Sequence, residues 1–289
     1  MKFKILIPIY NDWQSVSELL NNIDKTLSGI DQEISVIIVN DASNHERKED
    51  DKTYENIHSI KILNMEINQG HARCIATGLR YIYEKEDFDY VIPMDGDGED
   101  RPEEIKEFLD KIKESNGKAI VGQRVKRSEG LLFKICYQIH KLITLTFTGK
   151  SIKFGNYTCL PKEVVEKMIN EKATWNSFSG SLTKIETDLI SIPSIRGPRY
   201  FGPSKMSFYN LIKHSLSIIS VFRKTFLVRS ALFIILYILL IKSNASIVTA
   251  IPLVFLLIAV YSISNLALRE NMDEFDKALS NINDIENVK

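Results

Sequence analysis

Short apolar runs rich in Ile and Val alternate with stretches of helical periodicity along the first part of the chain. Five runs have the length and composition of buried strands, and they lie at 3–9, 34–39, 60–63, 90–94 and 119–121. Continuous apolar runs of this kind are typical of parallel sheets, whose strands are covered on both faces. The pattern predicts an α/β domain with a mainly parallel sheet, and such domains bind ligands at the carboxyl ends of their strands.

The segments between these runs carry apolar residues at helical spacing. The first stripe lies between the first two strands and consists of Val16, Leu19, Leu20, Ile23 and Leu27. Asp12 stands where the N-cap of this helix is expected. A second helix is predicted over 70–83. Pro102 suits the first turn of a third helix, whose apolar stripe is Ile105, Phe108, Leu109 and Ile112.

The hydrophobic pattern changes in the last third of the chain. Residues 208–225 would place polar and apolar side chains on opposite sides of a helix. The polar side has Lys213, Ser217, Ser220 and Lys224, and the apolar side has Phe208, Leu211, Ile212, Ile219 and Phe222. This pattern predicts an amphipathic helix lying in a membrane interface. The alternative is an amphipathic helix docked on a soluble core.

Two strongly apolar segments follow at 226–241 and 247–268, and they predict a transmembrane helix hairpin. The second segment is long enough to cross a bilayer, and the first is marginal against the roughly 20 residues required. Arg229 is expected to snorkel at the edge of the hairpin. Basic residues at the outer ends predict that both chain ends face the cytoplasm, in the inner membrane of a cell. A buried core hairpin is the alternative.

These patterns divide the 289 residues into four regions. They are an α/β domain over 1–205, an interfacial helix over 206–225, two transmembrane helices over 226–268 and a cytoplasmic tail over 269–289. The tail is polar and shows weak helical character. The apolar run at the N-terminus is too short for a signal peptide, and three widely spaced cysteines predict reduced structural thiols. The hairpin could support a homo-oligomer.

The formal net charge of zero hides a segregation of charge. Acidic residues outnumber basic ones before residue 118, whereas basic residues predominate from 118 to 229. The acidic half could hold a cation, and the basic half could hold phosphate or an anionic membrane surface. Solvated faces are the alternative interpretation. Nucleic-acid binding is not favoured, because the basic residues are not interleaved with exposed-looking aromatic residues.

The acidic stretch "VIPMDGDGEDRP" at 91–102 follows a predicted buried strand. Asp95 and Asp97 point to the same side because side chains alternate along extended backbone. Carboxylates suit hard cations such as Mg²⁺ and Mn²⁺, which keep positions open for substrate phosphate. An EF-hand loop is excluded, because its sixth and twelfth positions need Gly and Glu, and this chain has Asp100 and Lys106 there. A solvated acidic turn remains the alternative.

An ordered set of motifs accompanies this stretch. They are "PIYND" at 8–12, "VNDAS" at 39–43, "NQGHARCIATGL" at 68–79, "MDGDGEDRPEEI" at 94–105, "VGQR" at 121–124 and "RYFGPSK" at 199–205. The set resembles glycosyltransferase family 2, and within it the polyprenyl-phosphate hexosyltransferases, a group with the dolichol-phosphate mannose synthases and bacterial polyprenyl-phosphate glucosyltransferases. The resemblance covers most of the first 205 residues.

The resemblance implies a GT-A type fold and assigns roles to matching positions. The nucleotide-sugar donor, a UDP- or GDP-hexose, is expected to contact Pro8, Tyr10, Asn11, Asp12, Asp41, Gly70, Arg73 and Asp95. The cation, Mg²⁺ or Mn²⁺, is expected on Asp95, Asp97 and Glu99. The phosphate of a polyprenyl acceptor is expected on Arg124, Arg199, Ser204 and Lys205. Asp95, Asp97 and Arg124 are the expected catalytic residues, and His71 is a further candidate for the donor diphosphate, with a surface or core-edge role as the alternative.

The acceptor can be weighed from charge. A sugar hydroxyl needs a general base, whereas a phosphate monoester with a second pKa near 6 is already ionised at neutral pH. Carboxylates are scarce from 118 to 229, which favours a phosphate acceptor held by Arg and Lys. Together with the hexosyltransferase activity that the resemblance implies, this leads us to expect metal-dependent transfer of a hexose, with inversion, to an undecaprenyl-type phosphate.

One segment departs from the pattern of the relatives. Many of them carry an Asp shortly before the Gly that corresponds to Gly155 and an Arg soon after, whereas this chain reads "SIKFGNYTCL". Ile152, Lys153 and Phe154 supply no acid, and Thr158 takes the place of the Arg. Two alternatives therefore stay open: a family 2 transferase that acts on a hydroxyl of a lipid-linked glycan, and a non-catalytic membrane module that binds nucleotide sugar.

Overall fold

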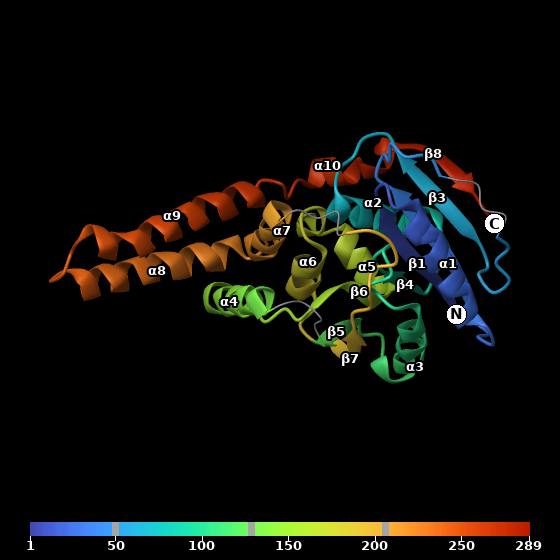
Figure 1. Cartoon of the computed structure of the whole chain (residues 1–289), viewed down its shortest axis with the longest axis horizontal. Helices are drawn as coiled ribbons and strands as arrows, with labels where there is room; N and C mark the ends of the chain where they lie inside the picture. Colours follow the sequence, from blue (N-terminus) through green and yellow to red (C-terminus); the bar gives the residue numbers. More distant parts are fainter. Residues whose placement is uncertain (48–51, 127–130, 204–207) are drawn as a thin grey trace.

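The computed structural model describes residues 1–47, 52–126, 131–203 and 208–289 (Figure 1). Its centre is an eight-stranded mixed sheet in the order β7-β5-β6-β4-β1-β2-β3-β8. The strands are β1 Lys2–Ile9, β2 Glu33–Asn40, β3 Ile60–Met65, β4 Tyr90–Pro93, β5 Ile120–Lys126, β6 Phe154–Pro161, β7 Ile190–Ile195 and β8 Ile282–Asn287. The predicted α/β class is confirmed, and all five predicted runs form strands.

The central strands are parallel, and antiparallel strands extend the sheet on both sides. β1 pairs in parallel with β2 and β4, and β2 pairs in parallel with β3. β6 runs antiparallel to both β4 and β5, and β8 runs antiparallel to β3. The carboxyl ends of β1, β2 and β4 therefore open at the same edge, where the predicted ligand site is expected.

Helices cover both faces of the sheet. On one face pack α1 Trp13–Leu27 and α3 Ile105–Ser115, and on the other α2 His71–Lys85, α5 Lys162–Ile169 and α6 Phe178–Ile185. The predicted apolar stripe of α1 is buried throughout. The described residues also form the short 3₁₀ helices η1 Pro102–Glu104, η2 Lys172–Trp175 and η3 Ala278–Asn281. Pro102 opens η1, directly before α3, in agreement with its predicted position.

Two long apolar helices leave the domain as an antiparallel pair, α8 Arg223–Ile241 and α9 Ile247–Ala267 (Figure 1). Only 11% and 6% of their most apolar windows are buried, which contradicts the alternative of a buried core hairpin. Both are long and apolar enough to cross a membrane. A further helix, α4 Leu131–Thr148, was not predicted from the sequence. It packs against α8, where the ring centroids of Phe147 and Phe226 are 5.4 Å apart.

The amphipathic helix predicted over 208–225 is α7 Phe208–Ser220. Its serine side is buried, and Asn176 donates a hydrogen bond of 2.9 Å from Nδ2 to Ser220 Oγ. Tyr209 and Ile212 are exposed. The helix therefore docks its serine side on the domain, as the alternative of a docked helix predicts, and the position of Tyr209 and Ile212 in a membrane interface stays a prediction.

Arg229, predicted to snorkel at the edge of the hairpin, caps a neighbouring helix. Its Nη1 donates to the carbonyl of Thr146 at 2.7 Å and to that of Leu145 at 3.3 Å. These carbonyls belong to the last turn of α4, where backbone acceptors lack partners within the helix and a positive charge is favoured. Arg229 thus joins α4 to α8.

The tail expected over 269–289 is not a loose polar segment. Residues 271–289, here called the C-terminal segment, form α10 Met272–Asp276, η3 and β8, and they complete the edge of the sheet. The ring of Phe275 is fully buried and stacks on Trp175 with 5.3 Å between centroids. The sequence "INDIEN" of β8 shows no buried-strand pattern because edge strands expose most of their side chains.

A buried ion-pair cluster joins β1, β3 and the end of α2. Glu86 accepts hydrogen bonds from Lys61 Nζ at 2.5 Å and Lys4 Nζ at 3.1 Å, and its side chain is 9% exposed. Burial opposes ionisation of Glu86, but the two lysines lower its pKa below the ordinary value. The cluster therefore contributes stability above the unfolded pKa of Glu86 and loses it as pH falls through the lower folded pKa.

We expect Glu86→Gln to lower the free energy of unfolding by about 2 kcal/mol at pH 7, because it leaves Lys4 buried without a countercharge. Chemical denaturation at pH 7 and below pH 4 measures this, and the deficit should shrink at acid pH. Glu84→Gln is the control, since Glu84 forms only a half-exposed pair with Arg80 at 3.3 Å. Equal losses in both variants would contradict a stabilising role of the buried cluster.

Candidate active site

The loops that follow β1, β2 and β4 meet at the carboxyl edge of the sheet. Asp41 is buried directly after β2, and it accepts backbone hydrogen bonds from Gln69 N at 2.7 Å and Gly70 N at 2.9 Å. Asn11, after β1, donates its N–H to Ser43 Oγ at 2.8 Å. These contacts bring together predicted donor residues from three separate motifs. Pro8 is buried within β1, whereas Tyr10 is 44% exposed at the edge.

Positive backbone φ angles mark these loops. Asn11 has φ 54°, Ala42 has φ 54° and Gly70 has φ 90°. The left-handed region is costly for residues with a Cβ, so the surrounding contacts must hold Asn11 and Ala42 in place. Asn11 Oδ1 accepts hydrogen bonds of 3.0 Å from the backbone of Asn44 and of His45. The loop after β1 is thereby tied to the loop after β2.

The acidic loop after β4 is covered by a basic segment that follows β7. Arg199 forms ion pairs with Asp97 and, at 2.9 Å, with Asp12, and Arg196 pairs with Glu99. The two backbones are also bonded, through Tyr200 N to Asp97 O at 3.0 Å and Gly197 N to Glu99 O at 2.8 Å. Arg199, which was predicted to bind the acceptor, is therefore in contact with Asp12 and Asp97, which were predicted to bind the donor and its cation.

The carboxylates of this loop influence one another. Burial, together with the charge of Asp95, raises the pKa of Asp97 to about 6, despite the nearby Arg199. Burial and Asp95 also raise the pKa of Asp100, whose Oδ2 accepts the N–H of Asp95 at 2.9 Å. Burial opposes ionisation of Asp95, but His71, Arg196 and Arg124 lower its pKa. The loop thus concentrates negative charge that favours a cation or a cationic partner.

Asn156, in the departing segment after Gly155, contacts the first aspartate of the loop. Its Nδ2 lies 3.3 Å from Asp95 Oδ1 and 2.7 Å from Nε2 of His71, and that imidazole nitrogen is 3.4 Å from Asp95. His71 therefore lies beside Asp95 at the exposed rim of this edge, with its side chain 38% exposed. Sequence reasoning missed Asn156 because it sought an acid before Gly155 and not an amide after it.

Arg124 reaches the site over the backbone of Gly155. A Cβ added to Gly155 would lie 2.8 Å from Nη2 of Arg124, so a side chain there would displace the guanidinium. Arg124 also acts on the pKa values of Asp95 and Asp100, which indicates its proximity to them.

We expect Gly155→Ala to lower transfer activity about ten-fold, because a misplaced guanidinium loses its charge-assisted contacts. Steady-state kinetics of the single variants Gly155→Ala and Arg124→Ala and of the double variant measure this as a double-mutant cycle. The two effects should not add. Full additivity would show that Gly155 does not act through Arg124.

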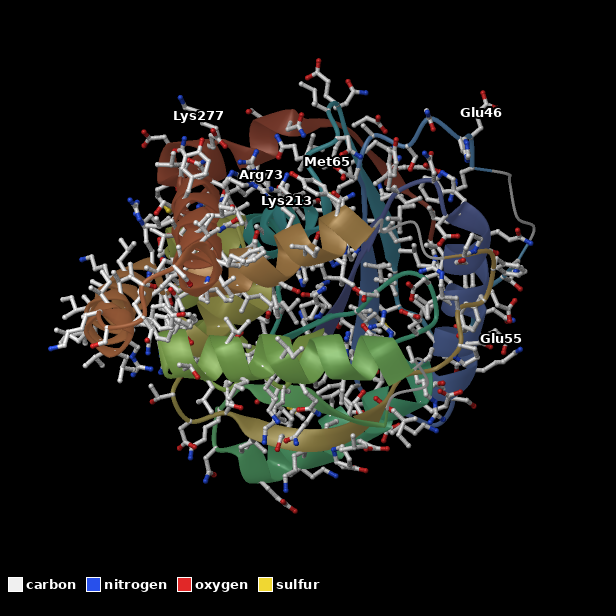
Figure 2. All side chains as sticks on the ribbon, turned by 60° about the vertical axis from the view of Figure 1, so that its left-hand side comes forward. Glu46, Glu55, Met65, Arg73, Lys213 and Lys277 are labelled. Carbon is white, nitrogen blue, oxygen red and sulfur yellow. The ribbon has the colours of Figure 1, made fainter. Side chains whose placement is uncertain are left out.

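The structure does not bring every predicted residue to the site. Arg73 pairs with Glu274 at 2.9 Å and lies 4.8 Å from the centroid of the Trp175 ring, close to the C-terminal ribbon (Figure 2). Its contacts are those of a residue that docks the C-terminal segment. The predicted acceptor residues Ser204 and Lys205 lie outside the described residues. Glu99 is engaged by Arg196, and within the described ranges no three Asp, Glu, His or Cys side chains gather as a ready ligand set.

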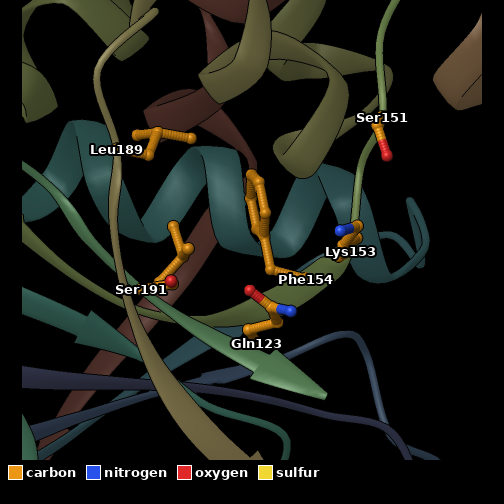
Figure 3. A pocket seen from close by; sticks show the side chains of 7 residues that line it. Gln123, Ser151, Lys153, Phe154, Leu189 and Ser191 are labelled. Atoms are coloured by element: carbon orange, nitrogen blue, oxygen red, sulfur yellow. The ribbon is translucent and has the colours of Figure 1, made fainter. Parts of the chain in front are cut away.

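A cavity of about 230 Å³ lies beside β5, β6 and β7. Its lining consists of Val121, Gln123, Ser151, Lys153, Phe154, Leu189 and Ser191, with the Phe154 ring at the centre (Figure 3). None of these is a predicted site residue. Gln123 and Phe154 directly precede Arg124 and Gly155, and alternation along the strands directs them away from the site.

The fold and this edge define an α/β protein of the GT-A type, with an acidic loop at the carboxyl end of β4. The sequence profile of glycosyl transferase family 2 matches residues 4–169, and the chain belongs to this family.

Curated relatives include the undecaprenyl-phosphate 4-deoxy-4-formamido-L-arabinose transferase of Klebsiella pneumoniae (strain 342), 27% identical over 227 residues. The protein of the same name from Proteus mirabilis (strain HI4320) is 28% identical over 227 residues. Each match covers 73% of this chain and 64% of the relative, so the chain spans less than two thirds of those proteins.

Solved structures with a similar fold include two synthases at low sequence identity. Glucosyl-3-phosphoglycerate synthase from Mycobacterium tuberculosis, in complex with Mn²⁺, UDP and phosphoglyceric acid, has a TM-score of 0.56 at 10% identity and covers 78% of both chains. Mannosyl-3-phosphoglycerate synthase from Rubrobacter xylanophilus has a TM-score of 0.53 at 10% identity and covers 76% of this chain and 72% of its own. At such identity these similarities establish the fold.

Proposed function

We propose that this protein transfers a sugar, a hexose in the first instance, from a UDP- or GDP-sugar to an undecaprenyl-type phosphate at the cytoplasmic face of the membrane. The observation that carries this proposal is Arg199, which joins Asp12 and Asp97 at the carboxyl edge. The guanidinium that we propose to bind the acceptor phosphate thus lies beside the carboxylates expected to face the donor. The names of the curated relatives, which specify undecaprenyl phosphate, support the same acceptor.

The acidic loop fits a divalent cation. Asp95 and Asp97 are close enough for Asp95 to raise the pKa of Asp97, and a cation would offset this repulsion. Mg²⁺ is commonly bound by one or two carboxylates together with substrate phosphates, so a complete protein ligand set is not required. Asp95 and Asp97 would hold the ion, which would neutralise charge developing on the leaving diphosphate. The mycobacterial synthase of similar fold binds Mn²⁺ together with UDP, which supports this assignment.

The side chains around Asp95 and Asp97 favour a phosphate acceptor. The second half of the chain, as far as the structure describes it, supplies Arg124, Asn156, Arg196, Arg199 and Tyr200 there, and none of these is a carboxylate. An acceptor hydroxyl would need a base among them, whereas an ionised phosphate needs only cationic partners. We propose direct displacement at the anomeric carbon with inversion, in which these residues orient the attacking phosphate oxygen.

The apolar surfaces support a membrane location. The α8–α9 pair extends from the domain, and α4 and α7 expose apolar residues such as Leu142 and Tyr209. Two spans with both chain ends in the cytoplasm would hold the active site beside the lipid headgroups, where a polyprenyl phosphate presents its charge.

The test is transfer of radiolabelled sugar from a panel of UDP- and GDP-hexoses and UDP-pentoses to undecaprenyl phosphate, in detergent with Mg²⁺ or Mn²⁺. We expect a chloroform-soluble product that forms only with cation present, and the panel would identify the sugar. Donor binding without any lipid product would overturn the proposal. Transfer to a lipid-linked glycan in that case would identify a hydroxyl acceptor, and binding without turnover on either acceptor would identify a non-catalytic module.

A further inference from the structure

The C-terminal segment, 271–289, packs against the loop that carries the predicted donor residue Gly70. This loop, 66–70, is here called the donor loop. It runs from the end of β3 to the start of α2, and its last two amides bind the carboxylate of Asp41. Sequence reasoning assigned no chemistry to the C-terminal segment.

The first link between the two is Asn281. Its Oδ1 accepts the N–H of Ile67 at 3.1 Å, and its Nδ2 donates to the carbonyl of Ile67 at 3.0 Å. The carbonyl of Asn281 accepts the N–H of Glu66 at 2.8 Å. The Asn281 side chain is 9% exposed, so these bonds are shielded from water. A carboxamide satisfies both the donor and the acceptor of Ile67, whereas a carboxylate can satisfy only the N–H.

The second link is a chain of side-chain hydrogen bonds across three strands. Asn64 on β3 donates to Asp284 Oδ2 at 2.9 Å, and Asn40 on β2 donates to Asn64 Oδ1 at 2.8 Å. Asn40 Oδ1 accepts the N–H of Ser43 at 3.1 Å, and Ser43 Oγ accepts the N–H of Asn11 at 2.8 Å. The chain thus connects β8 to the loop that holds Asn11.

Further contacts fix the C-terminal segment at both ends. Near its start Phe275 is buried on Trp175, and Glu274 binds Arg73 in the first turn of α2. At its end Lys289 Nζ donates to the carbonyl of Ile57 at 2.5 Å, and Lys289 N–H bonds the carbonyl of Ile60. A segment anchored in this way can hold the two loops in one geometry.

We propose that the C-terminal segment is a positioning element for the nucleotide pocket and that Asn281 is its principal positioning residue. Asn281 holds the donor loop in position, and the donor loop in turn orients the carboxylate of Asp41. The chain of hydrogen bonds from Asp284 holds the backbone of Asn11. The identity of the ligand, a nucleoside diphosphate sugar, rests on the proposed function. The C-terminal segment follows α9 in the sequence. The chain therefore leaves the domain through α8 and α9 and comes back to complete the donor pocket.

The experiment compares Asn281→Ala, Asn281→Asp and Asp284→Ala with Asn287→Ala in the full chain in detergent. Asn287 is the matched control because it is an exposed asparagine of the same segment, at the end of β8. We expect Asn281→Ala to raise the KM for the donor about ten-fold and to leave the KM for the acceptor unchanged. Asn281→Asp should show a smaller rise, since it keeps one of the two bonds, and Asn287→Ala should match the native protein.

Hydrogen exchange on the unliganded protein gives a readout that does not depend on the ligand. The amides of Gln69 and Gly70 should exchange faster in Asn281→Ala than in Asn287→Ala. Unchanged exchange there, or equal increases in the KM values for donor and acceptor, would overturn the positioning role. Failure of the native protein to bind UDP or GDP would instead overturn the proposed function and leave the exchange result to decide this inference.

Discussion

Asp97→Asn is expected to lower sugar transfer about 100- to 1,000-fold, with little change in folding. Asparagine has nearly the same shape and can still accept the N–H of Glu99, which Asp97 Oδ1 accepts at 2.9 Å. It removes the charge that would face a cation, and it leaves Arg199 with Asp12 as its remaining carboxylate partner. The loss of one preorganised electrostatic group in a site of this kind is commonly worth about two to three orders of magnitude.

The measurement is the cation-dependent formation of the chloroform-soluble product, together with Mn²⁺ binding followed by electron paramagnetic resonance. Asp110→Asn is the control, because Asp110 lies on the surface of α3 and pairs only with Lys113 at 3.5 Å. If Asp97→Asn kept native activity and native Mn²⁺ affinity, Asp97 would have no part in cation binding. A cation role would then have to rest on Asp95 without its neighbour.

Phe275→Ala is expected to lower the free energy of unfolding by about 3–5 kcal/mol. The Phe275 ring is fully buried, stacks on Trp175 and lies under Arg80, whose guanidinium carbon is 4.5 Å from the ring centroid. Its truncation leaves a cavity between α2, η2 and α10 and removes the aromatic contact. Such a loss should free α10 and weaken the pairing of β8 with β3.

Urea denaturation in mild detergent, followed by the fluorescence of Trp13 and Trp175, measures this prediction. Ile285→Ala is the control within the same segment, since Ile285 on β8 is 44% exposed and its removal should cost less than about 1 kcal/mol. A Phe275→Ala variant as stable as the native protein would show that the C-terminal segment does not belong to the cooperative fold.

The alternation of apolar runs and helical stripes was enough to predict the centre of the sheet. β1 and β2 are covered on both faces, so their sequences consist largely of Ile, Leu and Val. The parts that escaped prediction have weaker local signals. β7 alternates buried and exposed residues over a short span, and β8 is a polar edge strand whose place depends on free hydrogen-bonding groups of β3.

The candidate site shows the same division. The acidic loop was predicted because it follows an apolar strand, and Asn11, Asp12 and Asp41 were expected because they belong to motifs that resemble family 2. The sequence did not indicate that Arg73 would bind Glu274 or that Asn156 would contact Asp95. Side chains such as Arg and Asn have several possible partners, and local spacing carries no information about which of them comes near.

The chain alone was sufficient to establish an α/β domain with a carboxylate loop after its fourth strand and two apolar helices, because burial and periodicity are local properties. The tertiary structure established that Arg199 lies between Asp12 and Asp97 and that the last residues join the sheet beside β3. These contacts join residues far apart in the sequence. They depend on strand order and on the packing of the whole domain, which no local pattern encodes.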